Sequence, residues 1–238
     1  MSSPFRFKQF QVFDDKSTMK VGTDAVLLGA WAVPPLSGNI LDVGTGCGIL
    51  ALMMAQKSAA NIKAIDIHEP SIEQAAQNFS LSPWPDRLEA VYANIRDFGL
   101  NHAGCFDFII SNPPFFLNSL KPKQPKLLIA KHADSDFIDM FLDGVVSLLT
   151  PTGKIALIIP AQIFDNINRK MHNAGLFPVR KAKVFSKPGM APARIMVEAT
   201  LNKAESVAEE SIVIMDSMQH YTWDYKKLTQ DFYLFLNE

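Results

Sequence analysis

The fold of this chain is decided by the stretch Ile40-Leu41-Asp42-Val43-Gly44-Thr45-Gly46-Cys47-Gly48. Its first four residues form a short apolar run typical of a buried strand, and residues 49–55 form a helix rich in good helix formers. Alternating glycines between a strand and a helix form a ligand-cradling turn, because glycine adopts positive φ and lets a ligand approach the backbone. The free N–H groups at the start of the helix add to this cradle. The stretch therefore predicts a ligand-binding unit of an α/β domain.

Apolar runs and helical patterns alternate along the rest of the chain. We expect strands at 40–43, 62–66, 88–92, 106–110 and 154–159, helices at 49–55, 69–81, 134–149 and 165–173, and a strand pair near 179–185 and 195–201. This order predicts a doubly wound, mainly parallel, seven-stranded sheet with an antiparallel strand pair in its C-terminal part. No linker or internal repeat divides the sequence. Residues 1–238 are therefore expected to form a single domain, with 1–20 as an accessory strand or lid.

The composition is that of an ordinary globular protein. The chain has 238 residues, of which 48% are hydrophobic and 20% charged, with a net charge of −1. Its longest apolar stretch, 25–36, contains a glycine and two prolines and is too short to span a bilayer. With two cysteines and no signal-peptide core, we expect neither a disulfide framework nor a metal-ligand cluster, and a cytoplasmic location.

The charges are unevenly distributed along the chain. Residues 166–197 contain no acid and seven basic side chains: Arg169, Lys170, Arg180, Lys181, Lys183, Lys187 and Arg194. Residues 108–133 likewise contain no acid and carry Lys121, Lys123, Lys126 and Lys131. Residues 198–238 hold eight acids against three lysines. Segregation on this scale is compatible with a face that follows a phosphate backbone, and also with a solvated surface of uneven charge.

The spacing of the glycines indicates which ligand the turn holds. Asp66 ends the next predicted strand, where a carboxylate can accept both hydroxyls of a ribose. A dinucleotide fingerprint has its third glycine one position later, where this chain has Ile49. The compact form of Gly44, Gly46 and Gly48, with Asp42 just before it, is more typical of an S-adenosylmethionine site. The spacing therefore favours a methyltransferase over a nicotinamide-dependent enzyme.

A second motif, Asn112-Pro113-Pro114-Phe115, follows the apolar run 106–110. The Asn112 side-chain oxygen and the Pro113 carbonyl can accept the N–H groups of an exocyclic amine, which favours the tetrahedral nitrogen that attacks a methyl group. The prolines restrict the backbone, so these acceptors are already aimed. Phe115 can stack on a base. We therefore assign Asn112, Pro113 and Phe115 as catalytic residues and expect no general base; taken alone, the motif could also be a turn that ends the strand.

The two motifs are expected to meet. In a doubly wound sheet, ligands bind at the carboxyl ends of the strands that flank the switch point. If strands 40–43 and 106–110 are neighbours across that point, the glycine turn faces Asn112. A methyl sulfonium is already activated, so the reaction mainly requires alignment of the nitrogen behind the methyl carbon.

These motifs resemble those of class I amino-methyltransferases, which act on adenine N6 or glutamine N5. Further matching blocks are Phe5-x-Phe7-Lys8-x-Phe10, Met19-Lys20-Val21-Gly22-Thr23-Asp24, Leu27-Leu28-Gly29-Ala30-Trp31, Ser82-Pro83-Trp84 and Leu228-Thr229-Gln230-Asp231-Phe232-Tyr233-Leu234-Phe235. With them, nearly the whole chain resembles the bacterial tRNA(Val) adenine-N6 methyltransferases, which modify the adenosine 3′ to the anticodon. The resemblance implies a Rossmann-like class I methyltransferase fold and S-adenosylmethionine as cofactor.

The resemblance also implies the cofactor contacts. They are Lys20, Thr23, Asp42, Gly44, Gly46, Gly48, Asp66, Asn94 and Asn112. Asn94 departs from the aspartate that relatives usually have there, and it can still form one hydrogen bond to the cofactor adenine. Phe115 replaces a tyrosine and keeps its stacking face.

The implied partner is the anticodon arm of tRNA, bound through lysines and arginines in 121–131 and 169–194, with no membrane and no metal ion. Three alternatives remain at this stage. A glutamine-N5 protein methyltransferase shares the tetrad but is expected to carry a helical N-terminal domain, for which about 38 residues before the first strand leave no room. An rRNA base amino-methyltransferase is the second alternative. The third, an RNA adaptor that binds the cofactor without catalysis, is disfavoured by the intact tetrad.

Overall fold

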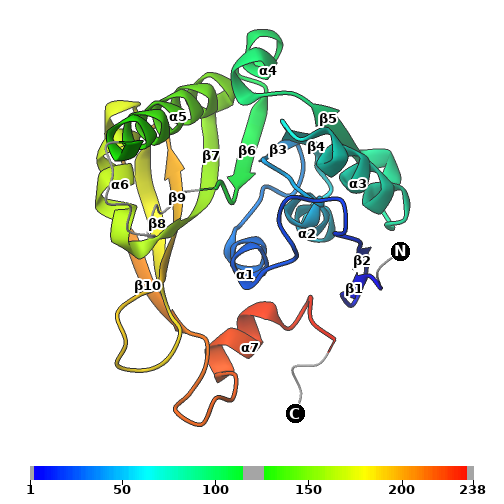
Figure 1. Cartoon of the computed structure of the whole chain (residues 1–238), viewed down its shortest axis with the longest axis vertical. Coiled ribbons are helices and arrows are strands. Elements are labelled where there is room, and N and C mark those ends of the chain that lie inside the picture. Colours follow the sequence, from blue (N-terminus) through cyan, green and yellow to red (C-terminus); the bar gives the residue numbers. More distant parts are fainter. Residues whose placement is uncertain (1–2, 115–125, 235–238) are drawn as a thin grey trace.

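The structure is a computed structural model that describes residues 3–114 and 126–234, and within 126–135 it describes the backbone alone. The elements are β1 (Phe5–Arg6), β2 (Gln11–Val12), α1 (Thr23–Trp31), β3 (Asn39–Val43), α2 (Ile49–Lys57), β4 (Asn61–Asp66), α3 (Glu69–Ser80), η1 (Pro85–Arg87), β5 (Leu88–Tyr92), α4 (Ile95–His102), β6 (Phe106–Ser111), α5 (Lys126–Leu148), β7 (Leu149–Pro160), η2 (Ala161–Ile163), α6 (Phe164–Asn173), β8 (Phe177–Phe185), β9 (Arg194–Thr200), β10 (Ala208–Val213) and α7 (Trp223–Thr229). Strands and helices alternate from β3 to β8, which confirms the α/β class (Figure 1).

One large sheet organises the described part of the chain. Its strand order is β10-β8-β9-β7-β6-β3-β4-β5. The strands from β5 to β7 are all parallel, whereas β9 runs antiparallel to both β7 and β8. The order reverses at β3, because β4 lies on one side of it and β6 on the other. The doubly wound, mainly parallel sheet and its antiparallel strands are therefore confirmed.

The expected number of strands is wrong, because this sheet has eight rather than seven. The additional strand, β10, pairs in parallel with β8 at the sheet edge. Its first four residues are exposed, so it lacks the apolar run from which the other strands were predicted. Register places Glu209 beside Lys181. Opposite charges on neighbouring strands stabilise their pairing. The sequence does not show this contribution, because the two segments are far apart along the chain.

The sheet has a hydrophobic core on each face. Side chains of a strand point alternately to opposite faces, so Ile40 packs with α1, α2, α3 and α7, while Leu41 packs with α4, α5 and α6. Figure 1 shows the sheet between these two sets of helices. Among the described residues, no helix combines the length and apolar character needed to cross a membrane.

Three helices and one helix boundary were not expected from the sequence. Helix α1 is buried over residues 25–31, so it has no polar face to reveal a helical period. The short helices α4 and α7 depend on caps: the Asn94 and Thr222 side chains accept hydrogen bonds from the backbone three residues later. Helix α5 begins at Lys126, eight residues before the predicted start at 134.

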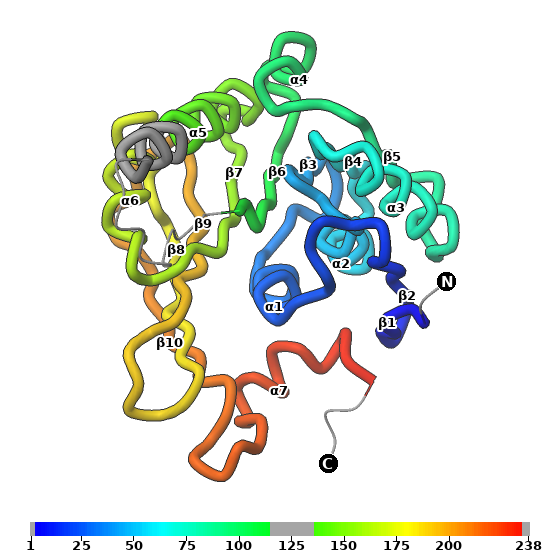
Figure 2. Tube along the Cα trace, in the orientation of Figure 1, coloured from blue at the N-terminus to red at the C-terminus, as the bar shows by residue number. Residues whose placement is uncertain are grey.

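The two ends of the described chain pack together. Strands β1 and β2 form a separate two-stranded sheet, and Lys8 N–H donates to the Phe232 carbonyl at 2.8 Å. The rings of Phe7 and Tyr233 stack with their centroids 5.9 Å apart. Figure 2 shows the N-terminal segment beside the C-terminal one. Residues 5–6 and 11–12 thus form two short strands, and the role of 1–20 as an accessory segment or lid stays a prediction.

Candidate active site

The glycine turn and the Asn112 motif begin side by side. Strand β3 pairs with β6, and the register places Asp42 opposite Ile110. The Ser111 hydroxyl donates a 2.7 Å hydrogen bond to the Val43 carbonyl, which joins the ends of the two strands. The prediction that these strands are neighbours across the switch point is confirmed. The loops that follow them, one beginning at Gly44 and the other at Asn112, therefore start side by side at the edge of the sheet where doubly wound folds form their ligand crevice.

All three glycines of the turn have positive φ, with values of 70° at Gly44, 55° at Gly46 and 85° at Gly48. They serve different purposes. A Cβ at Gly44 would meet nothing within 4 Å, so this position leaves space for a ligand. A Cβ at Gly48 would lie 2.5 Å from the Phe79 ring, so this glycine is required for packing against α3. The turn is thus open at its start and closely packed at its end.

Asp42 is fully buried, and its carboxylate connects the turn to α2. Its Oδ2 accepts hydrogen bonds from the Thr45 hydroxyl at 2.6 Å and from the Ala51 N–H at 3.1 Å. Its Oδ1 is buried without a partner in the described structure. Burial raises the pKa of the Asp42 carboxyl to about 7, although both hydrogen bonds favour its charged form. Asp42 therefore positions the turn, and its direct contact with a cofactor stays a prediction.

Asp66 connects the glycine turn to the next strand. One carboxylate oxygen accepts the Gly46 N–H and the other accepts the His68 N–H, both at 2.9 Å. The side chain is only half-buried. Because a carboxylate oxygen can accept more than one hydrogen bond, Asp66 can hold the turn and still accept ribose hydroxyls.

Beyond Asp66 lies a cavity of about 370 Å³. It is lined by Ile67, Tyr92, Ala93, Asn94, Asp97, Phe98, Asn101 and His102. Ile67 follows Asp66 directly and is 67% exposed, so it offers an apolar face to a flat ring. The Asn94 side chain already accepts the Asp97 N–H at 2.9 Å and donates to the Asp97 carboxylate at 2.6 Å. Asn94 therefore caps α4, and one amide hydrogen is left for a ligand.

Two buried side-chain amides of α3 form hydrogen bonds to the N-terminal segment at Phe13 and Lys16, and one of them also bonds to the glycine turn. The Asn78 amide donates to the carbonyls of Phe13 (2.8 Å) and Cys47 (2.7 Å), and its oxygen accepts the Phe13 N–H at 2.9 Å. The Gln74 oxygen accepts the Lys16 N–H at 3.1 Å. Asn78 thus binds the segment and the turn at once, and holds them in a fixed relation.

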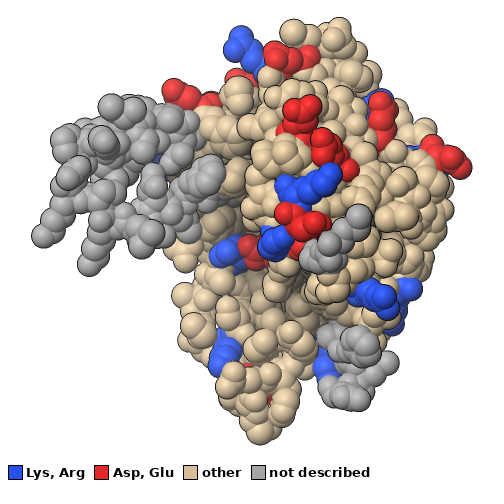
Figure 3. Space-filling view, turned by 45° about the vertical axis from the view of Figure 1, so that its right-hand side comes forward, with Lys and Arg blue, Asp and Glu red and all other residues tan. Residues whose placement is uncertain are grey.

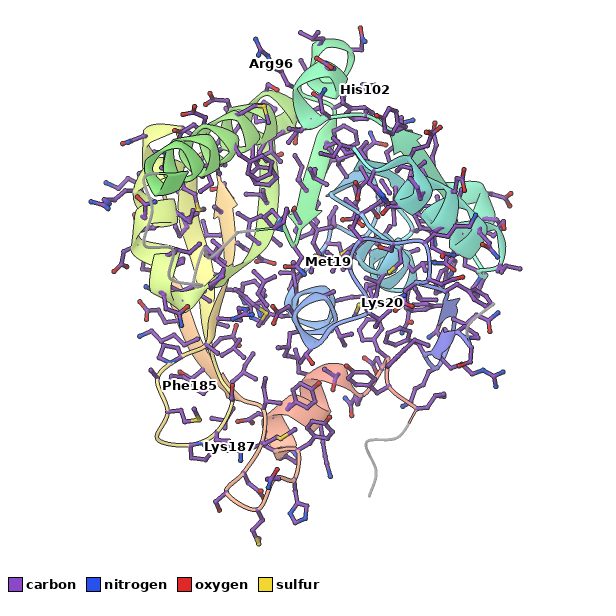
Figure 4. The ribbon with its side chains drawn as sticks, viewed as in Figure 1. Met19, Lys20, Arg96, His102, Phe185 and Lys187 are labelled. Atoms are coloured by element: carbon purple, nitrogen blue, oxygen red, sulfur yellow. The ribbon has the colours of Figure 1, made fainter. Side chains whose placement is uncertain are left out.

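The predicted contacts Lys20 and Thr23 lie where this segment leads into α1 (Figure 4). The Lys20 ammonium donates to the Asp14 carbonyl at 2.8 Å and lies 3.3 Å from the Asp14 carboxylate. Thr23 is exposed at the start of the helix. The Ser17 hydroxyl is buried without a partner among described residues, and it lies 3.1 Å from the place a Cβ would take at Gly46.

Asn112 is half-buried and Pro113 is buried, whereas Pro114 is exposed. In the part of the chain that the structure describes, the Asn112 amide has no hydrogen-bond partner. Its polar atoms are therefore available to a substrate. Phe115, the third predicted catalytic residue, lies outside the described residues.

Sequence reasoning missed the residues that hold the site together, above all Gln74 and Asn78. One signal was present. These two polar residues lie four apart on α3, directly before the buried Ala75 and Phe79, so they flank the apolar face of that helix. Buried amides must find hydrogen-bond partners, but the pattern does not say where in the chain those partners lie.

Most basic side chains of the segment 169–194 form ion pairs in the folded protein. Ion pairs join Lys170 to Asp139 (2.5 Å), Arg180 to Glu210 (2.9 Å), Lys181 to Glu209 (2.8 Å), Lys183 to Glu209 (4.0 Å) and Arg194 to Asp24 (2.8 Å). Within the described ranges, Arg169 and Lys187 have no ion pair. On the face shown in Figure 3, acidic and basic side chains are interspersed. The segment is therefore less free to bind phosphate than its sequence indicates, and the second predicted segment, 121–131, lies outside the described side chains.

Comparisons with known proteins give a consistent result. Residues 11–173 match the family model of the methyltransferase small domain. A tRNA1(Val) (adenine(37)-N6)-methyltransferase of Bacteroides fragilis is 41% identical over 98% of this chain and 99% of its own length. A protein of the same name from Serratia proteamaculans is 34% identical over 97% of this chain and 90% of its own length.

Solved structures show the same fold at low sequence identity. A predicted O-methyltransferase from Agrobacterium tumefaciens has a TM-score of 0.67 at 18% identity, and the match covers 88% of this chain and 96% of that one. A SAM-dependent methyltransferase from Aquifex aeolicus has a TM-score of 0.53 at 16% identity, with 79% and 95% covered. The Rossmann-like methyltransferase fold is therefore confirmed.

Proposed function

We propose that this chain transfers a methyl group from S-adenosylmethionine to N6 of adenosine 37 in tRNA1(Val). It belongs to the methyltransferase small domain family and to the tRNA1(Val) (adenine(37)-N6)-methyltransferases. Adenosine 37 lies 3′ to the anticodon. The observation that carries this proposal is the position of Asn112. This residue begins the loop after β6, next to the glycine turn that follows β3, and its side-chain amide has no hydrogen-bond partner among the described residues.

The residues present fit S-adenosylmethionine. Gly44 leaves space above the turn, and the unpartnered Asp42 Oδ1 and Ser17 hydroxyl beside the turn suit a ligand with polar and cationic groups. We propose that Asp66 accepts the ribose hydroxyls and that the cavity beside Ile67 holds the adenine ring. When bound, the cofactor supplies a methyl group that is activated by its sulfonium. We propose that Lys20 and Thr23 close the remaining side of this site.

Asn112 and Pro113 act on the other side of the crevice. The Asn112 side-chain oxygen and the Pro113 carbonyl accept the two N–H groups of the exocyclic amine, so that the nitrogen lone pair points toward the methyl group. The buried Pro113 keeps both acceptors in place, and such alignment accounts for much of the rate in a displacement of this kind. No general base is needed, because the amine becomes more acidic as it is methylated. Stacking of Phe115 on the base is part of the same proposal.

Labelled S-adenosylmethionine and unmodified tRNA test this function directly. The protein should transfer label to tRNA, and mass mapping of the nucleosides should locate one N6-methyladenosine beside the anticodon of tRNA1(Val). Release factor and ribosomal RNA serve as competing acceptors. Label that enters protein or ribosomal RNA alone would reject the tRNA substrate, whereas label at another tRNA adenosine would reject the position.

A further inference from the structure

Four large apolar side chains are exposed on the two loops that follow β8 and β10. Their exposed fractions are 55% for Met190, 73% for Met218, 42% for Tyr221 and 68% for Trp223, the first residue of α7. We call these four residues the apolar platform. Exposed apolar side chains that gather in one region can mark a binding surface, whereas single ones are common on soluble proteins.

Hydrogen bonds fix the loop that carries most of the platform. The Asp216 N–H donates to the His220 carbonyl at 2.8 Å, and the Asp216 carboxylate accepts the N–H groups of Met218 and His220 at 2.8 and 2.9 Å. The rings of Tyr221 and Tyr225 stack 4.8 Å apart. The loop is therefore tied back on itself, and its exposed side chains are presented in a defined arrangement.

The platform lies on the same edge of the sheet as the crevice. Strand β8 runs parallel to β6, and β10 runs parallel to β8, so all three end at the edge where the loop of Asn112 begins. The Ile214 N–H donates to the Phe185 carbonyl at 2.8 Å, which joins the bases of the two loops. Figure 1 shows both loops extending beyond the sheet next to α7, and Figure 4 places Phe185 and Lys187 at their base.

A basic side chain lies over the exposed aromatic ring of the platform. The Lys227 ammonium lies 4.6 Å from the centre of the Trp223 ring, and Lys187 begins the neighbouring loop. Acids lie in the same segment: the backbone hydrogen bonds of its loop lower the pKa of Asp216 and keep it charged, and Asp224 follows Trp223 directly, whereas Glu209 is paired with lysines of β8.

We propose that the apolar platform stacks unpaired bases of the RNA loop whose adenosine enters the crevice, with Lys187 and Lys227 beside its phosphates. This inference rests on the proposed function, since it names where that RNA lies. Proteins recognise RNA mainly in single-stranded loops, by stacking bases on aromatic rings, and a cation near the ring favours a nucleic acid over an apolar protein surface. Trp223 is the residue expected to contribute most, because it has the largest exposed ring.

The test compares Trp223→Ala and Trp223→Phe with Leu36→Ala. Leu36 is 85% exposed before β3, at the opposite edge of the sheet, so it is a matched control. The probes are a hairpin with the anticodon-arm sequence and a duplex of the same stem without unpaired bases. Trp223→Ala should weaken hairpin binding about 5- to 150-fold, the range expected for one lost stack, and should barely affect the duplex. Trp223→Phe should recover most of the affinity, and Leu36→Ala should bind as the wild type does.

Intrinsic fluorescence gives a second measurement that does not depend on turnover. Trp31 is buried and Trp84 is half-buried, so quenching on hairpin addition should come mainly from Trp223 and disappear in Trp223→Phe. Unchanged hairpin binding and quenching in the Trp223 variants would overturn the proposal, as would a loss of dimers in Trp223→Ala, since the platform would then bind a second copy of the chain. A wild-type protein that binds the hairpin through Trp223 but methylates no tRNA would contradict the proposed function instead.

Discussion

Two regions of this protein hold charged side chains in opposite ways. In the glycine turn, Asp42 is fully buried without a countercharge among the described residues, and its partners are a hydroxyl and a backbone N–H within nine residues of it. In the basic segment, Arg180 and Lys181 are paired with Glu210 and Glu209, which lie on a different strand. The buried carboxyl of the turn is thus satisfied by its own strand–turn–helix unit, whereas the basic segment is neutralised by distant parts of the chain.

This difference shows when the local sequence predicts the partners of a charged side chain. The hydrogen bonds of Asp42 close within one strand–turn–helix unit, so the local sequence predicts them. The partners of a cluster of like charges are not predicted in this way, because the fold can bring acids to it from any element. The same comparison explains why the apolar platform, rather than the basic strand β8, is the better candidate for RNA binding.

The largest expected effect concerns the close packing of the turn. In Gly48→Ala the new Cβ would lie 2.5 Å from the Phe79 ring at a φ of 85°, and strain with overpacking should lower the free energy of unfolding by about 2–5 kcal/mol. Gly44→Ala is the matched variant, since its Cβ has open space; it should lose about 1–2 kcal/mol of stability together with cofactor affinity. Urea unfolding and calorimetric cofactor binding measure the two effects, and equal stability losses would contradict this division of roles.

The second test removes the amide beside the turn. Asn112→Ala should reduce kcat about 10²–10³-fold, as does the loss of a hydrogen bond made mainly in the transition state. Cofactor affinity should change far less. Asn61→Ala, at the start of β4 and hence at the opposite edge of the sheet, serves as control. Single-turnover rates near the wild-type value would exclude the acceptor role of Asn112.

The third test uses the buried carboxyl of Asp42, whose pKa is raised from 3.8 to about 7. Between these values the folded state keeps a proton that the unfolded state releases, so stability is greatest below the lower value and falls as pH rises toward the upper one. From pH 5 to 7 the cofactor-free protein should lose about 2–3 kcal/mol from this group. Asp42→Asn should lack that loss. Parallel pH profiles of unfolding free energy for the two proteins would show that Asp42 is not responsible.

The smallest effect concerns single charges of the basic segment. Lys187→Ala should lower the slope of log binding constant against log salt by about 1, because its charge is not paired among the described residues. Lys181→Ala should leave the slope nearly unchanged, since Lys181 is paired with Glu209 at 2.8 Å. Titrations of tRNA at several salt concentrations measure both slopes. Equal changes in slope would mean that RNA displaces the ion pairs of β8 and that the segment acts as a whole.

Most of the fold could be predicted, as could the adjacent positions of the two loops that make up the candidate site. The apolar runs ending at Val43, Asp66 and Ile110 identify parallel strands, and the loops after them carry the glycine turn and Asn112. Strand β10 could not be predicted, because an exposed edge strand has no apolar run. The hydrogen bonds of the Asn78 amide could not be predicted either, since the acceptors Phe13 and Cys47 lie 65 and 31 residues away.

The sequence by itself determined the class of fold, and it predicted a cofactor turn and an acceptor motif, because each depends on backbone freedom or side-chain chemistry within a few residues. Only the tertiary structure decided that Asp42 is buried without a countercharge, that Asn78 joins the N-terminal segment to the turn, and that the lysines of β8 are paired. These properties depend on burial and on distances between residues far apart in the chain. Such distances arise only when the elements pack together.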